Sequence, residues 1–211
     1  MNKIFKTPPL IARMLPNYEW RLPTSKKEVF LTFDDGPSPH VTEWVLRRLD
    51  DYNAKATFFM VGKNVLSYPD LAREVVRNGH AIGNHTFTHL SGWTNFHRDY
   101  ISEIELADAV IESVIGFKPP YFRPPYGRIN FIATSDILKT HKIIMWDILG
   151  RDFDGELTAR ACIDNIIRHI KPGSTIVLHD SPKCALKLKV ILPELLDFLA
   201  AEEYALAPIC C

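Results

Sequence analysis

The sequence predicts an α/β protein built on a parallel sheet or a barrel. Short apolar runs alternate with amphipathic stretches, and several runs are apolar on both faces, as strands covered on two sides should be. Polar residues follow the ends of these runs. The 211 residues suffice for one sizeable core and contain no linker, low-complexity segment or repeat. We expect residues 1–28 to be an extension packed on a single domain of residues 29–211.

Seven runs rich in β-branched, aromatic and aliphatic residues are expected to be strands. The first, "VFLTFDD", ends in two adjacent carboxylates and a Gly-Pro turn. The seven strand ranges are Val29–Asp34, Ala56–Val61, His80–Gly83, Tyr121–Arg123, Lys142–Trp146, Thr175–His179 and a last one near Tyr204–Pro208.

Amphipathic stretches between these runs are expected to be helices, because their apolar residues recur at helical spacing. Gly79 and Gly116 stand where helix C-caps favour glycine. Repeated alternation of strand and helix predicts parallel strand pairing. The helix ranges are Val41–Tyr52, Asp70–Asn78, Asp99–Ile115, Ala159–Ile170 and Leu188–Ala201.

The charge balance and the N-terminal segment exclude some classes of partner. Lys+Arg and Asp+Glu each number 25, and a formal net charge of zero argues against nucleic acid and against an anionic-membrane anchor. Prolines and basic residues interrupt residues 1–20, so neither a signal peptide nor a transmembrane segment is expected. This favours a cytoplasmic protein, with a surface or periplasmic location still open. A tail resting on a membrane surface is the alternative.

Polar residues gather where the predicted strands end. Carboxyl ends of parallel strands share one edge of a sheet or barrel, and chemistry in such folds is found there. Five strand ends therefore predict one site. The residues concerned are Asp34 and Asp35, His85 and His89, Arg123, Asp147 to Asp152, and His179 with Asp180.

The segment "NHTFTHL" places His85 and His89 four residues apart. On a helical turn both imidazoles would reach one metal ion, whereas the alternative is two solvated histidines on a loop. Two histidines with the carboxylate of Asp35 make a catalytic metal site with an open position. Zn²⁺ is the default, and Co²⁺, Mn²⁺, Fe²⁺ or Ni²⁺ are possible. Asp34 could then take a proton from metal-bound water, although "DDG" alone can be an Asx-turn.

The segment "YFRPPYG" follows Arg123 with two prolines, which fix the backbone and orient the N–H of Tyr126. A preorganised N–H suits an oxyanion hole, although such a segment is more often a stiff surface loop. Arg123 could hold Asp34 through two hydrogen bonds. His179 ends "IVLH"; a lone histidine there is more often structural, but a carboxylate beside it would raise its pKa and make it a general acid.

The ordered blocks "TFDDG", "HTFTH", "RPPYG", "MWDILGRDFDGE" and "LHDS" together resemble the NodB-type polysaccharide deacetylases, carbohydrate esterase family 4. The resemblance runs from about Val29 to the last predicted strand. It implies that residues 29–211 are a single catalytic NodB-homology domain. The implied fold is a distorted (β/α) barrel, consistent with six to seven parallel strands.

The resemblance also implies a role for each matching residue. These roles are Asp34 as the catalytic base, Asp35, His85 and His89 as ligands of one divalent metal, Arg123 as the partner of the base, Tyr126 as the oxyanion donor, His179 as the general acid, Leu178 as the lining of the acetyl-methyl pocket, and Pro125 with Tyr126 as substrate contacts.

The fourth block departs from the family, which commonly has an Asp-Trp pair there. Asp152 aligns with the aspartate that supports the acid, with Asp147 and Asp154 as rivals. Phe153 aligns with the tryptophan, and it keeps an aromatic wall while losing an indole N–H.

Two tryptophans are candidate platforms on which a sugar ring could stack. Trp146 opens the fourth block, and Trp93 follows the paired histidines. An equal alternative is that both belong to the core.

The resemblance implies a metal-dependent hydrolase that removes N-acetyl groups from amino sugars of a peptidoglycan- or chitin-like polysaccharide or oligosaccharide and releases acetate. One alternative is an O-acetyl esterase acting on xylan-type substrates. Another is an inactive carbohydrate-binding member, although binding alone needs no metal ligands, base or acid. The missing export signal also makes an intracellular oligosaccharide or a lipid-linked sugar a candidate substrate.

Overall fold

The computed structural model describes residues 5–210 and places nine strands of that part of the chain in one sheet. The order is β1-β6-β5-β4-β3-β2-β8-β7, with β9 paired to β2, and every pairing of named strands is parallel. The strands are β1 (Tyr18–Glu19), β2 (Glu28–Asp34), β3 (Thr57–Met60), β4 (Ala81–Asn84), β5 (Tyr121–Phe122), β6 (Lys142–Ile144), β7 (Ile148–Leu149), β8 (Thr175–His179) and β9 (Ala205–Leu206).

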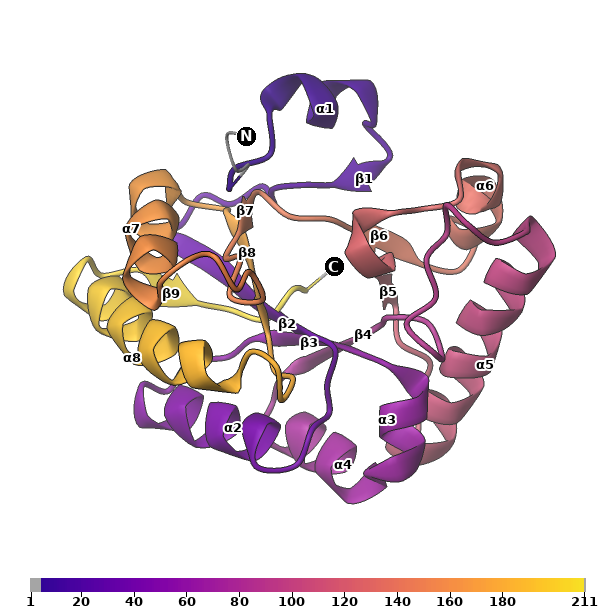
Figure 1. The fold of residues 1–211 in the computed structure, drawn as a ribbon, viewed down its shortest axis with the longest axis horizontal. Helices are drawn as coiled ribbons and strands as arrows, with labels where there is room; N and C mark the ends of the chain where they lie inside the picture. Colours follow the sequence, from indigo (N-terminus) through magenta and orange to yellow (C-terminus); the bar gives the residue numbers. More distant parts are fainter. Residues whose placement is uncertain (1–4, 211) are drawn as a thin grey trace.

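The sheet is curved, and helices cover its outer side (Figure 1). The distorted (β/α) barrel expected from the sequence is therefore confirmed. The helices are α1 (Pro9–Met14), α2 (Val41–Asp51), α3 (Gly62–Ser67), α4 (Pro69–Arg77), α5 (His97–Ile115), α6 (Thr134–Ile137), α7 (Ala159–His169) and α8 (Ala185–Ala201), with 3₁₀ turns η1 (Pro125–Gly127) and η2 (Phe131–Ala133).

All seven predicted strands are present, but the predicted count of six to seven was too low. The strands β1 and β7, each of two residues, were missed. Two residues carry no alternating pattern, so their pairing partners define them. The short helices α1, α3 and α6 were also missed, because one or two helical turns show little periodicity in the sequence.

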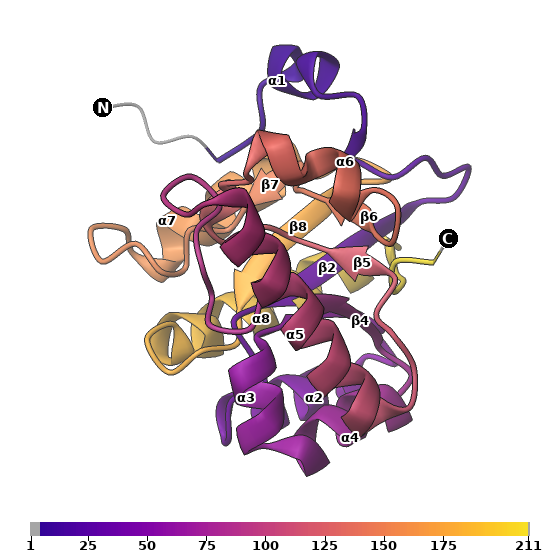
Figure 2. The same ribbon diagram turned by 90° about the vertical axis from the view of Figure 1, so that its right-hand side faces the viewer.

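The N-terminal segment joins the two ends of the curved sheet. Tyr18 and Glu19 pair with β6 at one end, and Lys6 forms an antiparallel bridge to Ile148 of β7 at the other. Figures 1 and 2 show this segment and α1 across the same end of the molecule. The segment predicted as a packed extension thus contributes backbone pairing as well as side-chain contact.

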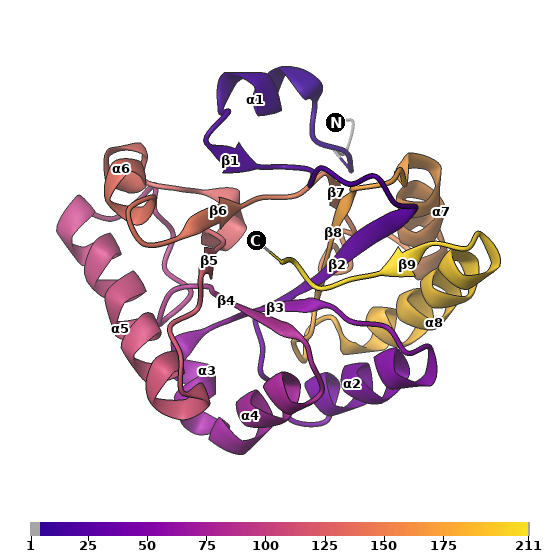
Figure 3. The ribbon, with the colours of Figure 1, turned by 180° about the vertical axis from the view of Figure 1, so that it is seen from behind.

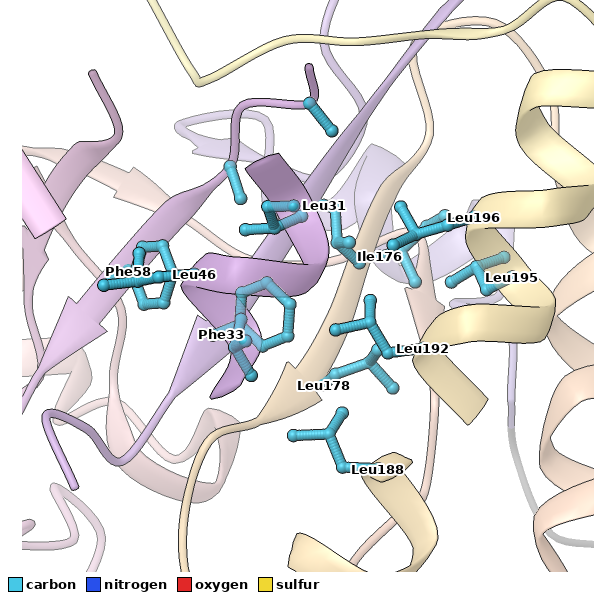
Figure 4. Close-up of a cluster of buried hydrophobic side chains, with 14 of the residues drawn as sticks. Leu31, Phe33, Leu46, Phe58, Ile176, Leu178, Leu188, Leu192, Leu195 and Leu196 are labelled. Atoms are coloured by element: carbon cyan, nitrogen blue, oxygen red, sulfur yellow. The ribbon is translucent and has the colours of Figure 1, made fainter. Parts of the chain in front are cut away.

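The main core lies between the sheet and helices α2, α4, α7 and α8. Figure 4 shows Leu178 in this core beside Leu188 and Leu192. Its cross-strand neighbour is Phe33, which is also buried there. The expectation that Leu178 lines the site was therefore wrong: side chains alternate along β8, so the flanking Val177 and His179 face the opposite side.

A smaller cluster fills the inside of the curved sheet. It contains Phe30, Phe59 and Ile144 from three strands, and Ile209 from the C-terminal segment. The backbone N–H of Ile209 donates to the hydroxyl of Thr57 at 2.9 Å. The C-terminal end of the chain therefore closes the side of the barrel opposite to the carboxyl ends of the strands, as seen from behind in Figure 3.

Within residues 5–210, no helix combines the length and the apolar character needed to cross a bilayer.

Replacing Leu178 with Ala should lower the free energy of unfolding by about 2–5 kcal/mol, because a fully buried leucine leaves a cavity. Leu186→Ala is the matched control: Leu186 lies on α8 and is 84% exposed, so its loss should change stability by less than about 0.5 kcal/mol. Urea unfolding followed by circular dichroism measures both. Equal effects of the two variants would contradict this description of the core.

Candidate active site

Asp34 and Asp35 both line one cavity, although neighbouring side chains in a strand point to opposite faces. Asp34 is the last residue of β2 and is buried. Asp35 has left the strand, and its φ of 80° is in the left-handed region that aspartate tolerates better than most residues. This turn brings the two carboxylates to one site.

Arg123, the residue that follows β5, holds the carboxylate of Asp34. Its Nη1 donates to Asp34 Oδ1 at 2.6 Å and to the Thr32 hydroxyl at 2.7 Å. Its Nε and Nη2 donate to the backbone carbonyls of Ile144 and Met145. The prediction of two hydrogen bonds from Arg123 to Asp34 was therefore wrong, because the guanidinium makes only one. Its other N–H groups donate to backbone carbonyls at the ends of neighbouring elements.

The guanidinium of Arg123 is fully buried and stacks over the ring of Phe59 at 4.0 Å from its centre. Burial lowers the pKa of Arg123, and the charge of Asp34 opposes that shift. A buried ion pair loses much of its hydration, so it is tolerated only when nearly every polar atom has a partner. The donors of Arg123 meet that condition, and Asp34 is consequently held in one position.

His85 and His89 lie on a loop after β4, so the predicted helical turn was wrong. Thr86 and His89 have positive φ angles of 62° and 63°. The side chain of Asn84 accepts the N–H of Thr86 at 2.7 Å, and the Thr86 hydroxyl accepts the N–H of Leu90 at 2.9 Å. These local bonds fold the loop so that the two imidazole centres lie 5.0 Å apart.

Each imidazole is oriented through its Nδ1 atom. Nδ1 of His85 lies 2.7 Å from the carbonyl oxygen of Arg123, and Nδ1 of His89 lies 3.1 Å from the hydroxyl of Tyr126. Both Nε2 atoms therefore face Asp35, whose Oδ1 is 3.8 Å from His85 and 3.1 Å from His89. Hydrogen bonding at the far nitrogen is the usual way a protein orients metal-binding histidines.

Asp35, His85 and His89 each offer one ligand atom, and these atoms lie within 4.8 Å of one another. Burial lowers the pKa of His85 to about 4, which keeps its Nε2 lone pair available. Burial opposes ionisation of Asp35, but the hydrogen bond with His89 and the charges of nearby histidines hold its pKa well below the ordinary range. Two neutral imidazoles and a carboxylate would fit one divalent cation.

Across the cavity, His179 forms a dyad with Asp152. Asp152 accepts from the His179 backbone N–H at 2.7 Å, and its other oxygen lies 2.8 Å from Nδ1. Burial would lower the pKa of His179, but the charge and hydrogen bond of Asp152 raise it to about 9. His179 is therefore charged at neutral pH. Its Nε2 is the nitrogen left free by this pairing.

The two rival aspartates lie elsewhere. Asp147 pairs with Lys6 and accepts from the hydroxyl of Ser174, and Asp154 pairs with Arg151. Cys184 is buried within 4.8 Å of ligand atoms of Asp152 and His179.

The cavity between these groups has a volume of about 140 Å³. Apolar side chains form one wall: Val177, Leu149, Trp146 and Phe153. The Phe153 ring meets His179 edge-on at 5.1 Å. The lining includes Pro124 rather than the predicted Pro125, which is buried beside it, because the peptide turns at η1.

Tyr126 stands at the mouth of this cavity. It has a φ of 60° within η1, and its side chain is 61% exposed. A positive φ in a tyrosine costs conformational energy and is typical of functional sites. Trp93 is also exposed, which rules out the core alternative for it, whereas Trp146 is partly buried and lines the cavity.

Two further ionisable residues lie close to the site: Asp180, which the sequence placed at the same edge as His179, and Lys183, which was not predicted. Lys183 Nζ lies 3.2 Å from Asp35 Oδ2. Burial raises the pKa of Asp180 to about 7, and its Oδ2 accepts from the hydroxyl of Thr42. A side chain at Gly36 would collide with this carboxyl. The motif "HDSPK" contains both residues, but nothing in the sequence showed that its turn folds back under Asp35.

A polar groove adjoins the site on the side of Asp35 and His89. Its volume is about 680 Å³, and its polar lining includes Lys63, Asn64, Thr88, Ser181 and Lys183.

Comparisons with known proteins agree with this geometry. The model of the family described as polysaccharide deacetylase matches residues 21–142. A peptidoglycan-N-acetylglucosamine deacetylase of Bacillus cereus is 33% identical over 78% of this chain, and the chain spans 60% of that relative. A chitooligosaccharide deacetylase of Azorhizobium caulinodans is 33% identical over 76% of the chain and 77% of its own length.

The fold has a counterpart among solved structures. A crystal structure of a peptidoglycan N-acetylglucosamine deacetylase, in complex with a hydroxamate, superposes with a TM-score of 0.86. The two sequences are 30% identical, and the match covers 92% of this chain and 91% of that one. The chain belongs to the NodB-homology polysaccharide deacetylases, carbohydrate esterase family 4.

Proposed function

We propose that the protein is a metal-dependent hydrolase that removes N-acetyl groups from amino-sugar residues of a peptidoglycan- or chitin-like glycan and releases acetate. One observation carries this proposal: a carboxylate and two histidines converge on one side of a small cavity, and a charged His-Asp dyad faces them. The names of the relatives, which describe deacetylases of amino-sugar glycans, support the substrate class.

Asp35, His85 and His89 would hold one divalent cation, with Zn²⁺ the first choice for two nitrogen ligands and one oxygen. Such a cation, when bound, polarises a carbonyl oxygen and makes a water molecule more acidic. The acetyl group fits the cavity with its methyl against the apolar wall that contains Val177 and Trp146.

Asp34 acts as the general base. Its carboxylate is fixed by Arg123 beside the three ligand residues, so one oxygen can accept the proton of the attacking water. His179 acts as the general acid on the opposite side. Because Asp152 keeps it protonated, it can donate a proton to the departing amine nitrogen, which is a poor leaving group without one. The backbone N–H of Tyr126 is assigned to the oxyanion.

The polar groove beside Asp35 is the place for neighbouring sugar rings. Its side chains include an amide, two hydroxyls and two ammonium groups, which can pair with sugar hydroxyls and carboxylates. The glycan would therefore extend from the cavity along the side that Asn64 and Lys183 form.

Asp34→Asn should reduce acetate release from chitooligosaccharides by about 10²–10⁴-fold, because the amide cannot accept the proton. The metal content, measured by atomic absorption after dialysis, should stay at the wild-type level, since Asp34 is not assigned as a ligand. Asp51→Asn, an exposed acid on α2, is the control and should be unaffected. Turnover close to wild type in Asp34→Asn would overturn the assignment of the base.

Asp152→Asn should move the alkaline limb of the kcat/KM profile to lower pH. The acid must be protonated, so activity falls as pH rises through the pKa of His179, which is about 9 in the native protein. Removing the charge of Asp152 removes the main cause of that raised pKa. Asp154→Asn, which alters a neighbouring aspartate paired with Arg151, should leave the limb in place. An unshifted limb in Asp152→Asn would contradict the role of the dyad.

Treatment with a chelator should abolish acetate release, and one equivalent of Zn²⁺, Co²⁺, Mn²⁺, Fe²⁺ or Ni²⁺ should restore it to different extents. His89→Ala should bind the cation more weakly because one of three ligand side chains is lost. Equilibrium dialysis measures the stoichiometry independently of turnover. Full activity in chelator with no bound metal would rule out the metal-dependent reaction.

A further inference from the structure

A second cavity opens beside the catalytic one and has a volume of about 390 Å³. The two cavities share Tyr126, Gly127, Trp146 and Leu149 in their linings. A molecule whose acetylated sugar occupies the first can therefore continue into the second. This second cavity lies next to Trp146, whereas the polar groove lies next to Asp35 and His89.

The second cavity is apolar. Its lining includes Ile11, Leu15, Phe131 and Met145, with the rings of Trp20, Trp93 and Trp146. A subsite for sugar needs partners for several hydroxyl groups, because a buried hydroxyl without a hydrogen bond is costly. Aliphatic side chains supply none.

Several polar side chains of this lining already have partners within the protein. Thr7 donates to the carbonyl of Trp146 at 2.6 Å, and Trp20 donates to that of Leu15 at 3.2 Å. The hydroxyl of Tyr18 contacts that of Thr134, the hydroxyl of Tyr126 lies beside His89, and Arg151 forms an ion pair with Asp154. The cavity therefore favours a hydrocarbon over a second sugar.

The segments that line this cavity also carry large apolar side chains that face solvent. Leu10 and Met14 are 67% and 70% exposed, and their spacing of four puts them on one face of α1. Ile132 of η2 is 77% exposed and Phe96 is 83% exposed. We call Leu10, Met14, Phe96 and Ile132 the apolar rim. Exposed apolar groups on neighbouring segments are typical of a surface that meets a membrane or a partner.

The rim is held by the segments that line the cavity. The Asn130 side chain donates to the carbonyl of Asn95 at 3.2 Å, which joins the loop before Phe96 to the turn before Ile132. Tyr18 and Thr134 connect β1 to α6. Helices α1 and α6 lie at the same end of the molecule in Figures 1 and 2. The part of the cavity wall that comes from residues 7–20 precedes the segment that the family model matches.

Cationic side chains accompany the rim. Arg13 is exposed on α1. The guanidinium of Arg128 lies 5.3 Å from the centre of the Trp93 ring and 5.7 Å from that of Tyr126, a residue that lines both cavities. An arginine stacked on aromatic rings keeps donors for a phosphate oxygen. Apolar side chains flanked by arginines match the interface of an anionic bilayer.

We propose that the protein acts on a lipid-linked amino sugar at a membrane surface, with the hydrocarbon chain in the second cavity and the apolar rim in the bilayer. The proposal rests on the proposed function, since the sugar must be deacetylated in the catalytic cavity. The net charge of zero argues against a purely electrostatic membrane anchor, whereas the rim would bind through apolar contact with the arginines acting locally. A phosphate between sugar and lipid would meet Arg128.

The test compares methyl, butyl and octyl glycosides of N,N′-diacetylchitobiose, with the octyl glycoside kept below its micelle concentration. Each buried methylene should tighten binding by roughly fourfold, so burial of only two of the added methylenes would lower KM by about tenfold or more from methyl to octyl. Phe131→Ser, which alters the cavity wall, should weaken this dependence. Co-sedimentation with vesicles of phosphatidylcholine and phosphatidylglycerol tests the rim directly.

The double variant Met14→Ser with Ile132→Ser should lose vesicle binding and retain hydrolysis of soluble triacetylchitotriose. Leu66→Ser is the matched control: Leu66 is 61% exposed on α3, at the opposite end of the molecule from α1, and vesicle binding should persist.

Equal KM values for the three glycosides, with chitotriose still hydrolysed, would overturn the lipid proposal and leave the proposed function standing. If Leu66→Ser lost vesicle binding as severely as the double variant, the proposed role of the apolar rim in membrane binding would also be overturned. Failure to release acetate from any glycoside or from chitotriose, with metal bound, would overturn the proposed function itself.

Discussion

The buried contact between Arg123 and Asp34 organises this site. One residue joins both halves of the proposed chemistry: its guanidinium fixes the carboxylate, and its own carbonyl oxygen orients His85. The Nε and Nη2 donors bind the carbonyls of residue 144, the last of β6, and of residue 145, which follows it. A fully buried charge is costly, and the fold compensates it with an opposite charge, hydrogen bonds and an aromatic face. The positions of these groups therefore depend on the geometry of the sheet.

The site also gives different pKa values to two histidine side chains, His85 and His179. His85 is surrounded by protein and loses its charge, with a pKa of about 4, whereas Asp152 keeps His179 charged, with a pKa of about 9. A neutral imidazole can bind a cation, and a charged one can donate a proton. Pairs of like residues whose environments separate their pKa values are a general route to an acid and a base in one site.

The sequence predicted the parts of this structure that long patterns encode. Seven strands and five helices have apolar periodicity over several residues, and strand ends located Asp34 and His179 correctly at one edge. Two-residue strands, whose existence depends on their partners, left no such signal. Leu178 was placed in the site because it precedes His179, although alternation along β8 points it into the core.

Other errors arose where loop conformation decides the outcome. The spacing of His85 and His89 fits a helical turn, but Asn84 folds a loop with positive φ angles instead. The alignment with the family already favoured Asp152 over its rivals, and the contacts of the three aspartates agree with that choice. Asp180 was expected at this edge, whereas Lys183 reaches the site through a turn whose direction no local motif encodes.

The N-terminal segment has a consequence for how such a protein can diversify. Residues 5–20 bridge the open ends of the sheet and also form one wall of the apolar cavity, while the proposed reactive groups come from β2, the loop after β4, β5 and β8. On the proposals above, part of the recognition of the molecule attached to the sugar would thus reside in a different stretch of chain from the reaction on the acetyl group. Mutation can reshape the first without disturbing the second, provided that the backbone pairing survives. On the lipid proposal, residues 5–20 would be an exchangeable selectivity element as well as a structural closure.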